Sequence, residues 1–301
     1  MTTGASFHPS GIMVALATPV QADGTLDEAG LERLVHRVVT GGVTGISPVG
    51  STGEGPRLTR AQRLAVCRRV RELAPTGMPV IPGVPLATME GGHAELAALS
   101  EAGATAALVA APSYYPLTDD GALRVYETLA DRSPLPLLLY NIPVFTKVSL
   151  APEVVARLAA HPAVAGIKDS SRDMGYQQQV LYATANADFS VLTGDDSLLV
   201  ASLTLGAAGT IAASANLVPG LVAGVFRAFA SGDVPAALSL QQRLTRIITA
   251  CRPGNPPAGW KAALEIAGVC SAHPVPPGSP LTAADRARLT AILTAEGVTP
   301  A

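Results

Sequence analysis

The sequence LPLLLYN at residues 135–141 is followed by PEVVARLAA at residues 152–160 and by VAGIK at residues 164–168. The first and third segments are short and almost continuously apolar, which is typical of parallel strands covered on both faces. The middle segment has the pattern of a helix. A strand, a helix and a second strand in this order indicate a βαβ unit within a parallel sheet.

Similar units continue in both directions along the chain. Six more apolar runs complete a set of eight candidate strands, at residues 11–18, 45–50, 79–84, 106–111, 189–194 and 209–213. Helix patterns lie between them, at residues 31–39, 90–101, 119–131, 176–185 and 196–205, with a last one starting near residue 216. Thr59 and Gln62 form a capping box that opens a further helix, which Pro75 ends.

Eight alternating units within about 220 residues predict a closed (β/α)8 TIM barrel, an α/β fold. The structural alternative is an open, doubly wound sheet. Its usual signature, G-x-G-x-x-G after the first strand, is absent from this sequence.

The rest of the chain differs in character from the barrel. From about residue 233 to residue 301 it has the pattern of three further helices, separated by proline-containing segments. We therefore expect two parts, a barrel with the active site at residues 1–232 and a C-terminal three-helix appendage at residues 233–301.

Composition excludes several functional classes. The 301 residues are 48% hydrophobic and 15% charged, which excludes a disordered chain. A net charge of −2 gives no basic footprint for nucleic acid. Mean hydropathy is +0.34, yet no apolar run reaches the ~18 residues of a membrane span. The start of the chain lacks the cationic region of a secretion signal, and the three cysteines have no metal-ligand spacing. We expect a soluble, cytoplasmic protein without nucleic-acid or membrane partners.

Polar residues gather where the predicted strands end, which is where barrel enzymes place their chemistry. Lys168, one of only three lysines, ends the apolar strand 164–168. Desolvation there favours the neutral amine, which is a nucleophile toward carbonyl groups. The alternative is a structural ion pair between Lys168 and Asp169 or another nearby carboxylate.

Two other strand ends carry groups of catalytic interest. Tyr140 ends the run 135–139 and could pass protons, although a core tyrosine is the commoner case. The turn from Gly50 to Glu54 reads GSTGE, and its successive backbone N–H groups could bind an anion. A plain βα turn is the alternative. The five histidines are scattered, so we expect no metal site.

Three motifs resemble those of the dihydrodipicolinate synthase/N-acetylneuraminate lyase family of class I aldolases. The turn GSTGE at residues 50–54 is similar to the loop of this family that binds the pyruvate carboxylate. The segment YNIP at residues 140–143 is similar to the catalytic-tyrosine motif, and GIKD at residues 166–169 to the Schiff-base strand. The motifs occur in the order of the family, and the resemblance extends from about residue 11 to residue 216, then more weakly over the tail.

The resemblance implies a mechanism and a set of site residues. Lys168 would form an imine with C2 of pyruvate or another 2-oxo acid, and Tyr140 would move the protons. Thr52 and Tyr115 would relay protons to solvent, with the tyrosine supplied across a dimer interface, while Ser51 and Thr52 would hold the carboxylate. No metal or organic cofactor is implied, because the imine is the electron sink. The implied assembly is a homotetramer built as a dimer of dimers.

The distal part of the substrate is less determined. Synthases of this family carry an arginine five residues after the catalytic tyrosine, where this chain has Phe145. We expect Phe145, Lys147 and Ile211 to contribute to substrate binding. Gly194, Asp195 and Asp196 follow the seventh strand, and the two aspartates could bind substrate hydroxyls or cap the next helix.

The sequence thus predicts a pyruvate-dependent Schiff-base lyase that cleaves or condenses a 2-oxo acid, such as a 2-keto-3-deoxy sugar acid or 4-hydroxy-2-oxoglutarate. Alternatives with the same imine are a 4-hydroxy-tetrahydrodipicolinate synthase and a keto-deoxy-acid dehydratase. From another class, the chain could be a non-catalytic relative that binds a 2-oxo acid. A phosphate-binding barrel is disfavoured because the acidic Asp195 and Asp196 follow the seventh strand, where such barrels bind phosphate.

Overall fold

A ring of parallel strands forms the centre of the computed structural model, which describes residues 7–298. The strands follow one another in the order β2-β1-β8-β7-β6-β5-β4-β3. A parallel bridge between Ile46 and Val80 and a hydrogen bond from the Ile81 N–H to the Ile46 carbonyl join β2 to the segment before β3, which closes the ring. The strands are β1 Gly11–Ala15, β2 Gly45–Ser47, β3 Gly83–Val84, β4 Ala107–Ala110, β5 Leu137–Asn141, β6 Val164–Asp169, β7 Ser190–Thr193 and β8 Gly209–Ala212.

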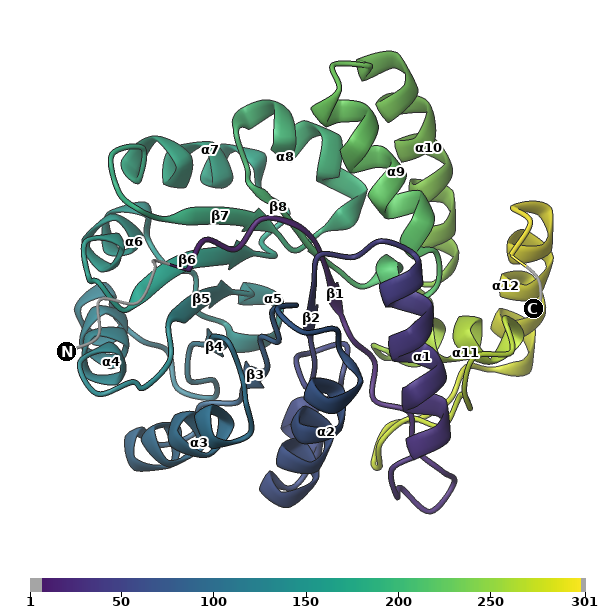
Figure 1. The fold of residues 1–301 in the computed structure, drawn as a ribbon, viewed down its shortest axis with the longest axis horizontal. Helices are drawn as coiled ribbons and strands as arrows, with labels where there is room; N and C mark the ends of the chain where they lie inside the picture. The colour runs from purple at the N-terminus through teal and green to yellow at the C-terminus, as the bar shows by residue number, and fades with distance from the viewer. Residues whose placement is uncertain (1–6, 299–301) are drawn as a thin grey trace.

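Helices surround the strands, as Figure 1 shows, and the predicted (β/α)8 barrel is confirmed. The predicted capping box at Thr59 and Gln62 opens α2, which ends before Pro75. Helix α5 was not predicted; it is a single turn directly after β5. The helices are α1 Glu28–Thr40, α2 Arg60–Leu73, α3 Met89–Glu101, α4 Asp119–Ala130, α5 Pro143–Thr146, α6 Pro152–Ala159, α7 Met174–Ala183, α8 Leu199–Leu205 and α9 Pro219–Ala230.

Alternation along the strands divides the core into two layers. Side chains of successive strand residues point to opposite faces, so Leu137 and Leu139 pack outward against the helices. Leu138 and Tyr140 point into the barrel, where they meet the inward-facing side chains of other strands, including Ile211 of β8. The nearly continuous apolar runs of the sequence follow from burial on both faces. Inward-pointing residues near the carboxyl ends of the strands form the floor of any site at that end.

Three further helices follow the barrel, as predicted: α10 Val234–Ala250, α11 Ala258–Ile266 and α12 Ala283–Ala295. They lie on one side of the barrel in Figure 1, where α10 packs against α9 and α12 packs against α10 and α11. The division of the chain at residues 232 and 233 stays a prediction, and residues 299–301 lie outside the described part.

Several predicted strands are longer than the observed ones. Residues 16–18 and 48–50 leave the sheet, and Val49 adopts a left-handed φ of 50° that no strand allows. These residues turn into the loops at the carboxyl end of the barrel. Within residues 7–298, no helix has the length and apolar character needed to cross a membrane.

Candidate active site

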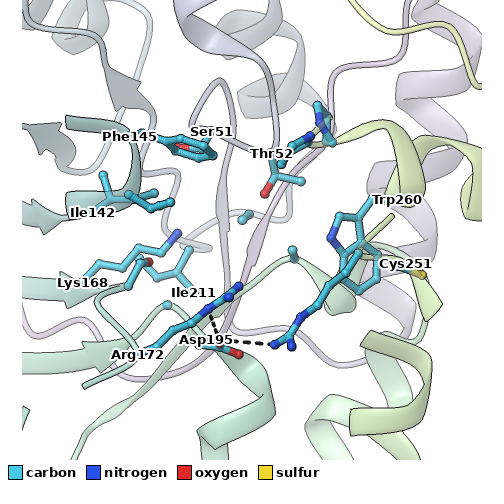
Figure 2. A pocket seen from close by; sticks show the side chains of 18 of the residues that line it. Ser51, Thr52, Ile142, Phe145, Lys168, Arg172, Asp195, Ile211, Cys251 and Trp260 are labelled. Atoms are coloured by element: carbon cyan, nitrogen blue, oxygen red, sulfur yellow. Dashed lines mark ion pairs between the residues drawn. The ribbon is translucent and has the colours of Figure 1, made fainter. Parts of the chain in front are cut away.

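A cavity of about 580 Å³ opens at the carboxyl ends of the strands. Its walls come from the barrel loops on one side and, on the other, from the segment 251–257 between α10 and α11 together with the first turn of α11. Figure 2 shows Lys168 entering this cavity from one side and Trp260 facing it from the opposite side. The C-terminal helices therefore complete a site whose floor the barrel provides.

Lys168 lies on β6, where it is paired in register with Tyr140 of β5. Its side chain is buried, and its Nζ lies 4.5 Å from the centre of the Tyr140 ring. Within residues 7–298 it forms no ion pair; Asp169 instead accepts hydrogen bonds from Asn141 at 2.8 Å and from the Ser171 hydroxyl at 2.9 Å. The structure thus does not contain the alternative ion pair between Lys168 and Asp169. The amine is left facing the cavity.

Two residues, one directly after β7 and one on β8, shape the space around this amine. Gly194 lines the cavity, and a Cβ atom at this position would approach the Lys168 Cε to 2.7 Å and collide with the Ser170 hydroxyl. A glycine is therefore required for the lysine side chain to take its observed path. Ile211 lies beside Lys168 on the floor of the cavity. Both residues line the cavity where the sequence predicted them.

Tyr140 makes its polar contact with Ser51. The two hydroxyl oxygens are 3.4 Å apart, and both residues line the cavity. Thr52 also lines the cavity, but its hydroxyl forms no hydrogen bond with any residue between 7 and 298. Among the described residues, the hydroxyl in contact with Tyr140 is therefore that of Ser51, and the relay role of Thr52 stays a prediction.

The backbone of the same turn offers two hydrogen-bond donors. The N–H groups of Ser51 and Thr52 have no acceptor among the described residues, and both residues are half-buried on the cavity wall. Val49 and Glu54 hold the turn at its ends with left-handed φ values of 50° and 54°. Successive free N–H groups in a turn of this kind can bind a carboxylate.

Glu54 fixes this turn to the C-terminal helices. Its carboxylate lies 2.5 Å from Lys261 Nζ of α11, and both side chains are only 1% exposed. It also accepts hydrogen bonds from Arg57 at 2.9 Å and from the Val275 N–H at 3.0 Å, while Lys261 donates to the His273 carbonyl. Burial lowers the pKa of Lys261, and the charge of Glu54 opposes this shift. The barrel turn and α11 are therefore held as one unit.

A second charged cluster lies on the cavity wall around Asp195. Its Oδ2 is 2.7 Å from Arg172 Nε and 3.6 Å from an Arg252 terminal nitrogen, as the dashed lines in Figure 2 mark. Its Oδ1 accepts from the N–H and hydroxyl of Ser197, so Asp195 also caps the short 3₁₀ helix Asp196–Leu198. The sequence prediction included Asp195 but missed both arginines and Trp260. Of these three residues, only Arg172 could have been proposed from the sequence, because it lies four residues after Lys168.

Two predicted substrate-binding residues lie away from the cavity. Asp196 is fully buried behind the wall, where it accepts hydrogen bonds from the backbone N–H and hydroxyl of Ser214, and burial raises its pKa. Lys147 is exposed and donates to the Val144 carbonyl at 3.0 Å. The structure does not bring either residue to the site, because Asp196 points into the core and Lys147 folds back on its own loop. Phe145 does line the cavity.

Tyr115 and its neighbour Tyr114 lie outside the cavity of their own chain. They are 74% and 88% exposed, and their rings meet edge to face with centres 5.0 Å apart. Tyr114 has a φ of 91°, which is unfavourable for a bulky residue. The relay role expected of Tyr115 is therefore not provided within a single chain.

Comparisons with known proteins agree with this geometry. The sequence model of the dihydrodipicolinate synthetase family matches residues 8–296. A 4-hydroxy-tetrahydrodipicolinate synthase of Acidiphilium cryptum is 36% identical over 299 residues, covering 97% of this chain and 99% of that protein. A prophage protein of the dihydrodipicolinic acid synthase family from E. coli K12, solved with pyruvate, has a TM-score of 0.92 and 30% identity, covering 96% of this chain and 99% of that chain.

A third similar protein is the chloride-inhibited dihydrodipicolinate synthase of Acinetobacter baumannii, also solved with pyruvate. It has a TM-score of 0.92 and 30% identity, and the match covers 96% of this chain and 99% of that chain. These matches include both the barrel and the C-terminal helices. The chain therefore belongs to the dihydrodipicolinate synthetase family, and it is a carbon–carbon lyase of the class I aldolase type.

Proposed function

We propose that this enzyme forms a Schiff base between Lys168 and pyruvate or another 2-oxo acid, and that it cleaves or condenses the acid through this imine. The observation that carries the proposal is the placement of Lys168. Its amine is buried in the cavity without an ion-pair partner between residues 7 and 298, and it lies 4.5 Å from the centre of the Tyr140 ring. Two relatives of the same fold were solved with pyruvate.

The site residues can perform each step of this chemistry. The neutral amine of Lys168 attacks C2 of the 2-oxo acid, and loss of water leaves a protonated imine. The backbone N–H groups of Ser51 and Thr52 hold the carboxylate during this step. When the C3–C4 bond breaks, its electron pair moves into the imine, and an enamine forms. No metal or organic cofactor is needed, because the imine accepts the electrons.

Tyr140 is the proton carrier in this proposal. It donates its proton to the hydroxyl group that leaves as water when the protonated imine forms. The resulting phenolate accepts the proton of the C4 hydroxyl during cleavage and returns it to C3 of the enamine. Ser51, 3.4 Å away, can pass protons onward from Tyr140. The relay then continues to the exposed pair Tyr114 and Tyr115 of a neighbouring subunit. The family resemblance assigns this step to Tyr115. Tyr114 is the second candidate, because an unfavourable φ such as its own tends to occur at functional sites.

Borohydride trapping tests the imine directly. Reduction in the presence of pyruvate should add one pyruvate-derived group per chain, located on Lys168 by peptide mass mapping. Lys168→Arg, which keeps the charge but is no longer a nucleophile toward a ketone, should abolish both the label and turnover. An unlabelled Lys168 in a folded wild-type protein would overturn the proposal. Labelling without turnover of any 2-oxo acid would instead support a non-catalytic, 2-oxo-acid-binding relative.

Cleavage activity and synthase activity can be distinguished by the substrates that the enzyme consumes. The family similarity to 4-hydroxy-tetrahydrodipicolinate synthases favours condensation of pyruvate with aspartate semialdehyde. Phe145 disfavours it, because it stands where such synthases carry an arginine for the second substrate. We therefore expect faster pyruvate release from 4-hydroxy-2-oxo acids or 2-keto-3-deoxy sugar acids than consumption of pyruvate with aspartate semialdehyde. The opposite order would identify a synthase.

We also propose a homotetramer, built as a dimer of dimers, in the cytoplasm. The exposed aromatic rings of Tyr114 and Tyr115, which follow β4, and the exposed Val144 and Phe145, which follow β5, support a subunit contact at this end of the barrel. Light scattering measures the assembly. Exchange of subunits between inactive Lys168→Ala and inactive tyrosine variants should restore activity if the tyrosine crosses the interface, whereas a monomer of full activity would refute the arrangement.

A further inference from the structure

The cavity continues well beyond the imine. Its volume of about 580 Å³ is far more than pyruvate, with six non-hydrogen atoms, can fill. Arg172, Asp195, Arg252 and Trp260 line this cavity together with Lys168, and Figure 2 shows Trp260 on the side opposite Lys168. Among the described lining residues, the charged ones are these two arginines, Lys168 and the single carboxylate of Asp195. The cavity thus carries an excess of positive charge, which attracts an acidic substrate.

Asp195 holds the two guanidinium groups on the cavity wall. Its side chain is 8% exposed, and its Oδ2 contacts Arg172 at 2.7 Å and Arg252 at 3.6 Å. Its other oxygen is occupied by Ser197, so the carboxylate cannot turn away from the arginines without losing those bonds. One carboxylate facing two guanidinium groups leaves one positive charge uncompensated. The terminal nitrogens of Arg172 have no hydrogen-bond partner among residues 7–298 and remain available to a ligand.

The backbone of Arg172 provides an independent observation. This residue has a φ of 66°, a left-handed conformation that glycine adopts freely and arginine does not. It lies in the short loop between β6 and α7, four residues after Lys168. Backbone strain of this kind tends to occur at functional sites, where a particular side chain is needed despite its unfavourable conformation. The need for a guanidinium group at this place in the cavity explains why a strained arginine occupies it.

Resting on the proposed Schiff-base function, we infer that Arg172 and Arg252 form a subsite for a distal carboxylate, so that the enzyme acts on a 2-oxo acid with a second acidic group. Guanidinium groups match the planar geometry of a carboxylate and can bind both of its oxygens. A Cβ atom at Gly194 would lie 2.7 Å from Lys168 Cε, and Asp195 is the next residue, so the carboxylate that holds the arginines follows directly on the residue beside the reactive lysine. Phe145 and Trp260 provide apolar wall beside the intervening carbon chain.

Trapping with commercially available acids tests the subsite without knowledge of the natural substrate. The probes are two pairs of equal carbon number, 2-oxoglutarate with 2-oxopentanoate and 2-oxoadipate with 2-oxohexanoate. For each acid, the concentration giving half-maximal borohydride labelling of Lys168 is measured. The wild type should bind the preferred diacid about ten-fold or more tightly than its monoacid partner. This factor lies at the lower end of the range for a hydrogen bond to a charged group, because both arginines are partly exposed.

Arg172→Gly is the decisive variant, because glycine adopts the observed φ and should fold at least as well. It should weaken labelling by the preferred diacid about ten-fold and leave the matched monoacid within about two-fold. Arg252→Gln should act in the same direction, and Arg172→Lys should recover part of the loss. Thermal unfolding checks that each variant is folded.

Three results separate this inference from the proposed function. If pyruvate labels Lys168 but the wild type does not distinguish diacids from monoacids, the subsite is refuted while the Schiff base stands. The subsite is equally refuted if Arg172→Gly weakens diacid and monoacid labelling alike. If neither pyruvate nor any other acid labels Lys168, the proposed function itself fails.

Discussion

Replacing Lys261 with methionine removes one partner of the buried ion pair that joins α11 to the turn at residues 50–54. Glu54 and Lys261 are each 1% exposed and lie 2.5 Å apart, so Glu54 would be left without its main counter-ion inside the protein. Removing one partner of a buried pair destabilises a protein by about 3–5 kcal/mol. Taking about 2 °C per kcal/mol for a chain of this size, Tm should fall by about 6–10 °C.

The variant should also weaken binding in the active site. The N–H groups of Ser51 and Thr52 are presented by a turn whose left-handed residue Glu54 is held by Lys261. We therefore expect a higher pyruvate concentration for half-maximal labelling of Lys168, while saturating pyruvate still labels the folded protein.

The chain provides a matched control for this substitution. Lys147→Met makes the same chemical change at an exposed lysine whose amine donates a hydrogen bond to the Val144 carbonyl. Its unfolding free energy should change by no more than about 0.5 kcal/mol. The double variant Glu54→Gln/Lys261→Met should be more stable than Lys261→Met alone, because it removes a buried carboxylate whose remaining partners are the half-buried Arg57 and the Val275 N–H. A loss below about 1 kcal/mol for Lys261→Met, with unchanged pyruvate labelling, would refute the reasoning.

Three other predictions follow from the site geometry. Ser51→Ala should lower kcat about 100-fold and retain pyruvate labelling, whereas the kcat of Thr52→Val should stay within about five-fold of the wild-type value. Steady-state kinetics compares the two variants, and equal losses would contradict the relay through Ser51. Tyr115→Phe should lower kcat about 100-fold, whereas Tyr114→Phe should leave kcat nearly unchanged. A loss of kcat confined to Tyr114→Phe would assign the relay to Tyr114 instead. Cys251 lines the cavity, but burial raises its pKa, so thiol reagents at pH 8 should react only after unfolding; rapid labelling of the native enzyme at Cys251 would show this to be wrong.

The barrel could be predicted because burial on both faces leaves a direct trace in the sequence. Each of the eight predicted runs contains an observed strand, and only β6 extends past its run, by Asp169. The lengths of the strands could be predicted less well. Residues 16–18 and 48–50 are as apolar as the strands before them, yet they turn toward the site, and burial in a loop leaves the same apolar signal as burial in a sheet.

The site was predictable where side-chain direction follows from strand alternation. Lys168 and Tyr140 lie on paired strands, so their inward direction follows from their register. Turns have no such periodicity, so the sequence could not show that Ser51 rather than Thr52 contacts Tyr140. Arg252 was missed for another reason. It reaches the cavity from the segment after α10, and no local pattern shows that this segment folds over the barrel.

The two-sided construction of the cavity has a consequence for enzyme engineering. In the proposed mechanism, bond making and breaking depend on Lys168 and Tyr140 of the barrel, whereas part of the opposite wall comes from the loop 251–257 and from Trp260 of α11. Grafting the corresponding loop of another family member onto this barrel, with α11 and its Lys261 kept in place, should exchange selectivity while sparing the reactive lysine. Libraries randomised at Arg252 and Trp260 would explore new aldol products from an unchanged catalytic scaffold.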